Sequence, residues 1–308
     1  MRAFASVRRD PRGGAGLAVT RLAWLVLPTL ALCLATDAGA VIIDSGDGTG
    51  NTSAPSPDPG WAHVGLRGGL TAVHVGDHFV LTANHVADGA VVLSGVTYDF
   101  VPGSSVRLQN DDESFADLKI FAVTPAPPLP PLPIATSTPP AGTALIYAGN
   151  GRQRGADTSW DPNDHPSPPA AIDGYEWISP GILRWGTNSA EFFPTGRVFN
   201  TESFASLFDA GSASDEAQAT TGDSGGAAFA WNGSQWELAG VMIAISLLVV
   251  EGAQQPSTVS LYGQATYSAD LSVYRDQILD VIAMPEPRGG LAAGVALLVL
   301  LAKRRRSA

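Results

Sequence analysis

The sequence predicts an all-β protein made of two barrel-like halves, with a short helix at the end of the second half. From Trp61 onward, short apolar runs alternate with turn signals at the spacing of a strand meander. The composition, with 34 Gly, 23 Pro and 15% charged residues, favours short strands joined by turns over long helices. Eight prolines between residues 125 and 140 exclude a ladder strand there, so we expect a stiff connection between the two halves.

The expected elements follow from the apolar runs and the turns between them. Residues 44–60 mix Gly, Ser, Asp and Pro without an apolar period and are expected to form a loop. The expected strands are 70–75, 78–83, 90–93, 96–101 and 118–123 in the first half, and 144–148, 181–185, 227–231, 236–244 and 258–262 in the second.

Residues 271–282 differ from the rest because their apolar positions recur at helical spacing. The residues expected to line one side of this helix are Leu271, Tyr274, Ile278, Leu279 and Ile282. Either Asp270 or Ser268 could cap its start.

Residues 1–40 have the features of a secretory signal peptide. Five arginines precede an apolar run at 22–35, and Ala38-Gly39-Ala40 offers the small residues that a signal peptidase accepts. The run is shorter than the roughly 20 residues of a spanning helix, so cleavage is favoured over an uncleaved membrane anchor. The only cysteine, Cys33, lies in this segment, and the mature chain would therefore have no disulfide, no thiol nucleophile and no Cys-based zinc site.

The C-terminal residues 284–308 combine a Pro-Glu-Pro stretch, an apolar run at 291–302 and a basic cluster at 303–306. This order resembles the PEP-CTERM sorting signal of Gram-negative bacteria. The resemblance implies export to the periplasm, cell surface or extracellular matrix, with processing by an exosortase-type sorting machinery. The basic cluster would hold the tail in transient contact with the inner membrane, and a plain tail anchor is the alternative.

The charge of the middle of the chain argues against nucleic acid as a partner. Residues 41–284 hold 8 Lys or Arg, which is 18 minus five at each end, and 26 Asp or Glu, which is 29 minus two and one. The net charge of this part is near −18, because 8 minus 26 is −18. Such a surface repels a phosphate backbone and is typical of a well-solvated exported protein.

Three short segments carry the residue types of nucleophilic catalysis by serine. A serine hydroxyl needs a base to take its proton, the base needs a partner that fixes its tautomer, and the oxyanion needs fixed donors. Residues 80–85 form an apolar segment that ends in His85, and Asp117 directly precedes the apolar segment 118–123. Residues 221–226, Thr-Gly-Asp-Ser-Gly-Gly, place Ser224 on a tight turn framed by glycines.

Together these segments resemble the trypsin/chymotrypsin family, over roughly residues 61–282. The resemblance implies two six-stranded antiparallel β-barrels of trypsin-like type: 41–135 with the N-terminal segment, and 136–283 with the terminal helix. It also implies hydrolysis of protein or peptide substrates with no metal and no organic cofactor. The implied roles are His85 as general base, Asp117 as its orienting carboxylate, Ser224 as nucleophile, and the N–H groups of Gly222 and Ser224 as oxyanion hole.

The order of the three residues along the chain supports this resemblance. An α/β hydrolase needs its histidine after the serine, and no histidine follows His165. Subtilisin-like enzymes place the aspartate first. The order here is His85, Asp117, Ser224, which is the trypsin-like order.

Several points stay open at this level. Asp111, Asp112 and Glu113 lie close to Asp117 in the sequence and could orient the histidine instead. Signal cleavage would expose Val41, which could insert beside the aspartate before Ser224, as the activating N-terminus does in that family. Alternatively, the active form could arise without this step.

The sequence also leaves alternatives for the substrate specificity and for the function of the protein. The position six residues before Ser224, which sets the pocket floor in the resembled family, is Gln218, so an uncharged pocket is expected. Asp215 and Glu216 are near enough that a small shift of the loop would change this. The alternatives to a peptidase are a protease-like fold kept as a surface or biofilm-matrix interaction protein, and a structural envelope protein whose only signal is the sorting tail.

Overall fold

The computed structural model of the chain describes residues 41–162, 171–191, 196–211, 214–250 and 252–284. The predicted signal peptide and the predicted sorting tail after Met284 lie outside the described residues. Within the described ranges, no helix combines the length and the apolar character needed to cross a membrane.

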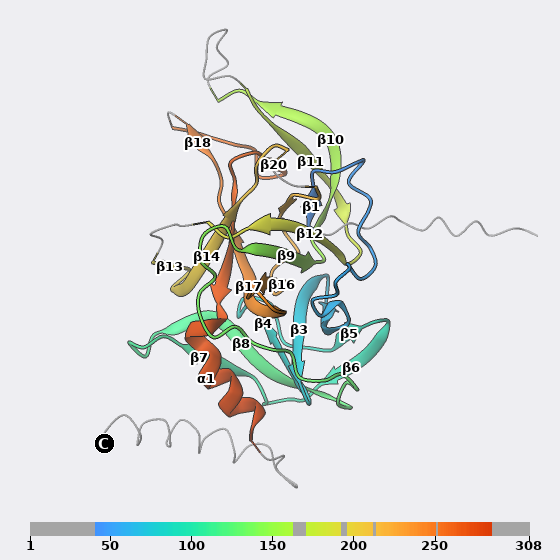
Figure 1. The fold of residues 1–308 in the computed structure, drawn as a ribbon, viewed down its shortest axis with the longest axis vertical. Coiled ribbons are helices and arrows are strands. Elements are labelled where there is room, and N and C mark those ends of the chain that lie inside the picture. Colours follow the sequence, from blue (N-terminus) through green and yellow to red (C-terminus); the bar gives the residue numbers. More distant parts are fainter. Residues whose placement is uncertain (1–40, 163–170, 192–195, 212–213, 251, 285–308) are drawn as a thin grey trace, which may run out of the picture. The chain divides into compact units, whose positions relative to one another are not determined.

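The first half forms a closed antiparallel barrel (Figure 1). Its strands follow the order β4-β3-β2-β5-β6-β8, and pairing of β4 with β8 closes the ring, with β7 added outside on β8. The strands are β2 (Val64–Arg67), β3 (Leu70–Gly76), β4 (Phe79–Thr82), β5 (Val91–Leu93), β6 (Val96–Phe100), β7 (Val106–Gln109) and β8 (Phe115–Thr124), preceded by the 3-10 turn η1 (Trp61–His63).

The predicted strands of this half are all present, and two more accompany them. Strands β2 and β7 were not predicted, because both are only four residues long and each contains an arginine. Strand β8 begins at Phe115, so Asp117 lies inside it and not in front of it.

The second half contains a seven-stranded antiparallel sheet in the order β12-β9-β16-β17-β21-β14-β13. Its strands are β9 (Ala144–Gly149), β12 (Arg184–Ser189), β13 (Arg197–Val198), β14 (Thr201–Leu207), β16 (Ala227–Trp231), β17 (Trp236–Ile245) and β21 (Ala265–Asp270). Among the described residues, the two edges meet through an isolated bridge between Glu191 and Ala205, and not through a continuous ladder. A second closed six-stranded barrel therefore stays a prediction.

A long hairpin extends this half. Strands β10 (Arg152–Trp160) and β11 (Ile172–Pro180) pair with each other, and β11 also pairs with β20 (Val259–Leu261). A small separate hairpin consists of β18 (Val249–Val250) and β19 (Ala253–Gln254). Strands β10 and β11 were not predicted from the sequence, because β10 is mostly polar and neither strand shows a sustained apolar alternation.

The N-terminal segment begins inside the second half. Strand β1 (Ile42–Ile43) pairs with β15 (Ala217–Gln218), and Val41 is completely buried. Residues 44–60 form the expected loop. This loop lies against β12, where the Arg184 side chain donates to the carbonyl oxygens of Thr49 and Gly50.

The proline-rich stretch 125–140 connects the halves as expected, with no strand in it. It does, however, pair at one point, where Ile134 forms an isolated bridge with Leu238 of β17. Two backbone hydrogen bonds flank this bridge, one donated by Ala135 and one accepted by Pro133. A proline can accept in such a ladder even though it cannot donate.

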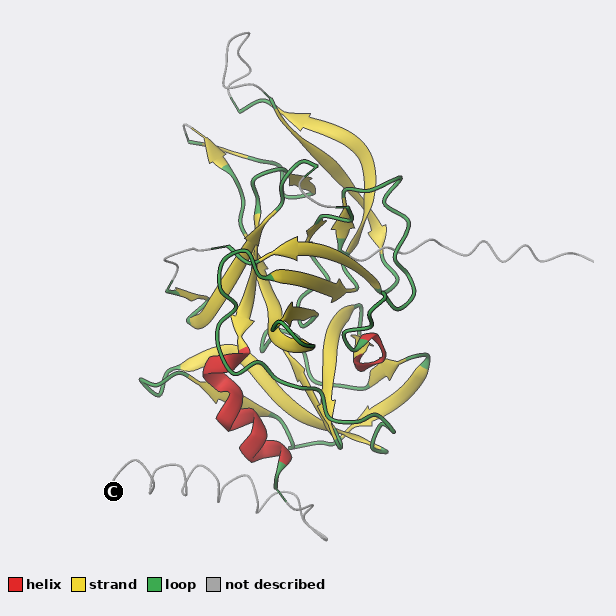
Figure 2. Ribbon diagram, viewed as in Figure 1, coloured by secondary structure: helices red, strands yellow, loops and turns green. Residues whose placement is uncertain are grey.

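The terminal helix α1 (Leu271–Ile282) has the predicted bounds, and Figure 2 shows it in red against the strands. Asp270, one of the two expected caps, accepts a hydrogen bond from the N–H of Ser272 at 3.0 Å. The buried side of the helix consists of Leu271, Tyr274, Ile278 and Val281. The prediction that Leu279 belongs to this side is wrong, because Leu279 is exposed and Val281 takes its place.

One hydrophobic core runs through both halves. Its buried members include Leu81 and Leu118 from the first barrel, Phe229 and Val241 from the second sheet, and Tyr274 from α1. The halves therefore share a core and hold the loops at their junction in fixed positions.

Candidate active site

His85 and Asp117 form a directly bonded pair. The Nδ1 atom of His85 lies 2.6 Å from Oδ2 of Asp117, and the backbone N–H of His85 donates to Oδ1 at 2.9 Å. Because an ionised carboxylate can only accept, Nδ1 carries the hydrogen, and the lone pair of Nε2 is left to accept a proton. The His85 side chain is 45% exposed and that of Asp117 only 10%. The imidazole is therefore accessible from solvent, while the carboxylate bonded to it is buried.

The backbone of Asp117 is held by a residue of the second half. The backbone N–H of Asp117 donates to Oγ1 of Thr201 at 2.7 Å, and Thr201 is fully buried at the start of β14. This contact joins β8 to β14 directly beside the His85–Asp117 pair. The sequence analysis did not identify Thr201, since nothing in its local context indicates a partner 84 residues away.

The neighbouring carboxylates that could have replaced Asp117 lie in the turn between β7 and β8. Asp112 accepts from the guanidinium of Arg197 and from the hydroxyl and N–H of Ser114. These bonds lower the pKa of Asp112 to about 2, the Ser114 hydroxyl contributing most. Within the described residues, Asp117 is the carboxylate in contact with His85, and the sequence preference for it agrees with this geometry.

The Ser224 loop is docked on the first barrel. The backbone N–H of Thr71, in β3, donates to the carbonyl oxygen of Ser224 at 3.0 Å. The Thr71 carbonyl accepts in turn from the hydroxyl of Thr82 at 2.8 Å, and Thr82 ends the strand that leads to His85. A single hydrogen-bonded path thus runs from the Ser224 loop to the segment that carries the histidine.

The free backbone donors of this loop match those of an oxyanion hole. The N–H groups of Asp223, Gly225 and Gly226 donate to Thr220, Met242 and Asp223 respectively. The N–H groups of Gly222 and Ser224 donate to no acceptor within the described part of the chain. Gly222 is buried and has φ +110°, a conformation that favours glycine. Two unpaired N–H groups on one turn are the donors that an oxyanion hole needs.

The Ser224 hydroxyl makes no hydrogen bond to any side chain that the structure describes, and the His85 ring is bonded to Asp117 and not to Ser224. Catalytic hydrogen bonds are often long or poorly aligned before substrate binds, so we expect a bond between the two only with substrate present.

Asp223, next to the nucleophile candidate, is fully buried and faces the start of the described chain. Burial raises the pKa of Asp223 to about 7, while hydrogen bonds from Thr220 and from the backbone N–H groups of Gly151 and Val41 oppose the rise. Its Oδ1 atom has no partner with full hydrogen-bond geometry among the described residues. The segment that signal cleavage would expose therefore already lies at this carboxylate.

A pocket of about 250 Å³ opens beside Ser224. Its wall consists of Phe199, residues 219–221, 223–224 and 242–245. Gln218, the residue expected at the pocket floor, is completely buried and is not part of this wall. Its side chain donates to the carbonyl of Ala265, and its backbone pairs with Ile42.

Two further histidines, His63 and His74, form a buried pair. The rings of His63 and His74 stack at 5.2 Å, with their Nδ1 atoms 3.1 Å apart. Burial lowers the pKa of both rings, that of His63 to about 4. Neither ring is in contact with the His85–Asp117 pair in the described structure.

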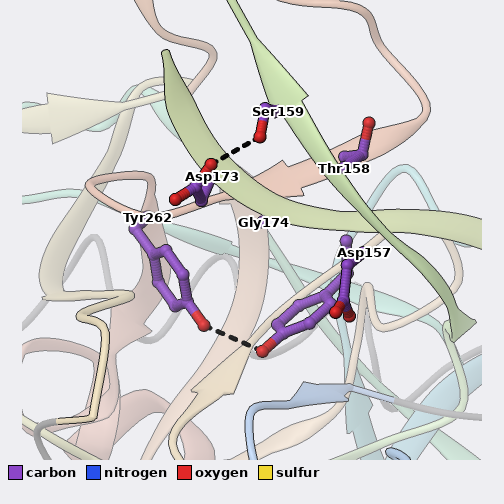
Figure 3. Close-up of a pocket in the computed structure, with 7 residues that line it drawn as sticks. Asp157, Thr158, Ser159, Asp173, Gly174 and Tyr262 are labelled. Carbon is purple, nitrogen blue, oxygen red and sulfur yellow. Dashed lines mark hydrogen bonds between the residues drawn. The ribbon is translucent and has the colours of Figure 1, made fainter. Parts of the chain in front are cut away.

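A larger cavity of about 390 Å³ lies elsewhere, on the β10–β11 hairpin (Figure 3). Its polar side chains bond to one another: Ser159 to Asp173, and the hydroxyl of Tyr175 to that of Tyr262. Both hydroxyls also lie within hydrogen-bond distance of the Asp44 carboxylate, so the two tyrosine hydrogens are shared among three contacts. These contacts tie the hairpin to the N-terminal segment, and the cavity shares no residue with the Ser224 pocket.

The described residues include no group of three or more His, Cys, Asp or Glu side chains placed to hold a metal ion. What the fold and the motifs define is a protein with the architecture of the trypsin-like serine peptidases.

Comparison with known sequences agrees with this class. The family described as "Trypsin-like peptidase domain" matches residues 70–241, more than half of the 308-residue chain. The chain belongs to this family. A search of curated proteins finds no match. Among solved structures, the chain is similar to mouse neuropsin, a serine protease expressed in the limbic system of the brain, with 18% identity and a TM-score of 0.48. That alignment covers 76% of this chain and 98% of neuropsin.

Proposed function

We propose that the protein is an exported serine endopeptidase that cleaves peptide bonds through an acyl-enzyme intermediate. The observation that carries the proposal is the His85–Asp117 pair, bonded at two points, beside a Ser224 loop that is hydrogen-bonded to the strand next to it. A module that only binds a partner needs neither the oriented imidazole nor the free backbone donors.

In the proposed reaction, Oγ of Ser224 attacks the carbonyl carbon of the substrate while Nε2 of His85 takes the hydroxyl proton. The N–H groups of Gly222 and Ser224 stabilise the oxyanion that forms. His85 then gives its proton to the leaving amine, and the C–N bond breaks to leave an ester on Ser224. Water, activated by the same histidine, hydrolyses this ester and restores the serine. Asp117 holds the tautomer of His85 and stabilises the imidazolium.

The test is hydrolysis of an unstructured protein such as casein by the purified chain, compared with the Ser224→Ala variant. We expect peptide release by the wild type and none by the variant, with unchanged circular dichroism. Ser257→Ala, which removes an exposed serine hydroxyl outside the pocket, is the matched control and should retain hydrolysis. If the wild type releases no peptides and reacts with no fluorophosphonate, the alternative of a protease-fold interaction protein replaces the proposal.

Export and sorting are part of the proposal, on the sequence features of residues 1–40 and 284–308. The protein would reach the periplasm, cell surface or extracellular matrix of a Gram-negative bacterium, after processing by an exosortase-type machinery. Mass spectrometry of the protein recovered from its host tests this. A mature N-terminus at Val41 and loss of the basic tail are expected, while an intact residue 1–40 segment would contradict export by cleavage.

A further inference from the structure

Most of the side chains that line the pocket beside Ser224 are apolar. Residues 242–245 of its wall are Met-Ile-Ala-Ile, and Ala219 and Phe199 also line it. Thr220 has its hydroxyl occupied, because it donates to Asp223 and accepts from the N–H of Arg152. A pocket with such a lining favours an apolar ligand group.

The carboxylates that could have made the pocket anionic lie outside it. Asp215 accepts from Ser45, and Glu216 is almost fully buried. Asp223 belongs to the wall, but its side chain is fully buried and is bonded to Thr220. A lysine or arginine side chain in this pocket would lose its hydration without gaining an opposite charge from the described residues, which strongly disfavours binding.

Phe199 lines this pocket, and its backbone has an unusual conformation. Its side chain is 68% exposed although it is a large aromatic residue, and its φ is +47°. Left-handed backbone is rarely adopted by bulky residues, and here the next residue, Asn200, is left-handed as well, with φ +57°. A strained and exposed aromatic residue at a cavity is a candidate for contact with a ligand.

The turn that carries Phe199 is held in place by the first barrel. The side-chain amide of Asn200 donates to Oγ of Ser114 at 2.9 Å and to the carbonyl of Phe115 at 3.1 Å. The carbonyl of Asn200 accepts from the side chain of Asn110 at 2.8 Å. These three bonds fix the backbone of the turn at Asn200, next to Phe199, whose side chain stays open to solvent.

From these observations we propose that the pocket selects an apolar side chain of the substrate, and that Phe199 is a specificity-determining residue that packs against it. The proposal rests on the proposed peptidase function. Because Ser224 itself lines the pocket, the selected side chain belongs to the substrate residue whose carbonyl Ser224 attacks. The partner is therefore a peptide with an uncharged apolar residue, such as Leu or Met, on the acyl side of the cleaved bond.

The experiment measures kcat and KM of the full mature chain on matched peptides that differ only at this residue. The expected kcat/KM is at least 100-fold higher for Leu than for Lys or Arg. Phe199→Asn should raise KM for the Leu peptide about tenfold with kcat nearly unchanged. The same variant should keep or raise Tm, because asparagine tolerates the left-handed backbone better than phenylalanine. Trp231→Ala, which removes an exposed aromatic side chain outside the pocket, is the matched control and should leave KM unchanged.

Labelling of Ser224 by a small dialkyl fluorophosphonate distinguishes a failure of the proposed apolar preference from a failure of the proposed peptidase function. Normal labelling together with equal cleavage after Leu and Lys, or with an unchanged KM in Phe199→Asn, overturns the apolar preference and leaves the peptidase function standing. A wild-type chain that neither labels nor cleaves any of the peptides overturns both.

Discussion

The contact between the Ser224 loop and the first barrel leaves no room for a side chain at Gly225. A Cβ atom on this residue would lie 2.0 Å from the carbonyl oxygen of Thr71 and 2.2 Å from Oγ1 of Thr82. The backbone of Gly225 also has φ +86°, which L residues rarely adopt. Gly225→Ala therefore pushes the loop away from the β3–β4 edge on which it is held.

The magnitude follows from the contacts that are lost. The left-handed conformation costs an alanine roughly 1–2 kcal/mol. The hydrogen bonds from Thr71 to Ser224 and from Thr82 to Thr71 cannot both survive the overlap, and each contributes about 1 kcal/mol. We expect Gly225→Ala to lower the free energy of unfolding by about 2–4 kcal/mol in total.

Gly263→Ala is the matched control. Gly263 has φ +91°, close to that of Gly225, but a Cβ atom there would meet nothing within 4 Å. Its expected loss is the conformational cost alone, roughly 1–2 kcal/mol. Urea unfolding followed by tryptophan fluorescence measures both variants, and the difference between them reports the steric overlap.

The same variants test the consequence for the site. A displacement of the Ser224 loop by about 1 Å is expected to slow fluorophosphonate labelling about 100-fold in Gly225→Ala and to leave Gly263→Ala unaffected. Equal destabilisation of the two variants, with equal labelling rates, would refute the reasoning that the loop is fixed through Thr71.

Three further predictions concern ionisable groups. Asp117→Asn should lower kcat by about 10³–10⁴-fold with little change in KM, because the amide favours the wrong tautomer of the histidine; steady-state kinetics measures this. Burial lowers the pKa of His63 and His74, so the unfolded chain takes up protons first as the pH falls below about 6.5. Stability should then drop by about 1–2 kcal/mol at pH 5, and His63→Gln should reduce this loss in urea titrations. Burial raises the pKa of Asp223 to about 7 in the uncleaved chain, so the folded state takes up a proton first as the pH falls through 7. Protonation of Asp223 should therefore contribute about 2 kcal/mol of stability to that chain between pH 8 and pH 5, opposite in sign to the histidine effect. A chain that begins at Val41 should lack this contribution, because its α-ammonium group pairs with the carboxylate; the difference between the two profiles of Tm against pH measures it.

Much of the site could be predicted from sequence because its chemistry is encoded locally. The segments ending in His85 and surrounding Ser224 are short and distinctive, and the helical spacing of 271–282 gave the bounds of α1. The triad order along the chain needs no three-dimensional information.

The supports of the site could not be predicted because they come from distant parts of the chain. Thr201 meets Asp117, and Asn200 meets Ser114, only once β14 lies beside β8. The polar hairpin β10–β11 has no apolar alternation, so its pairing became visible only in the structure. The prediction that Gln218 forms the pocket floor was made by counting six residues back from Ser224. It is wrong, because the Gln218 side chain is buried and does not line the pocket.

The role of His85 as the base for Ser224 is tested most directly by the rate at which Ser224 forms an adduct with a fluorophosphonate, located by peptide mass spectrometry. Removal of the imidazole in His85→Ala should slow adduct formation on the order of 10²–10⁴-fold in a chain that still unfolds cooperatively. An adduct that forms on Ser224 at the same rate in both proteins, or at no measurable rate in the wild type, would contradict the account.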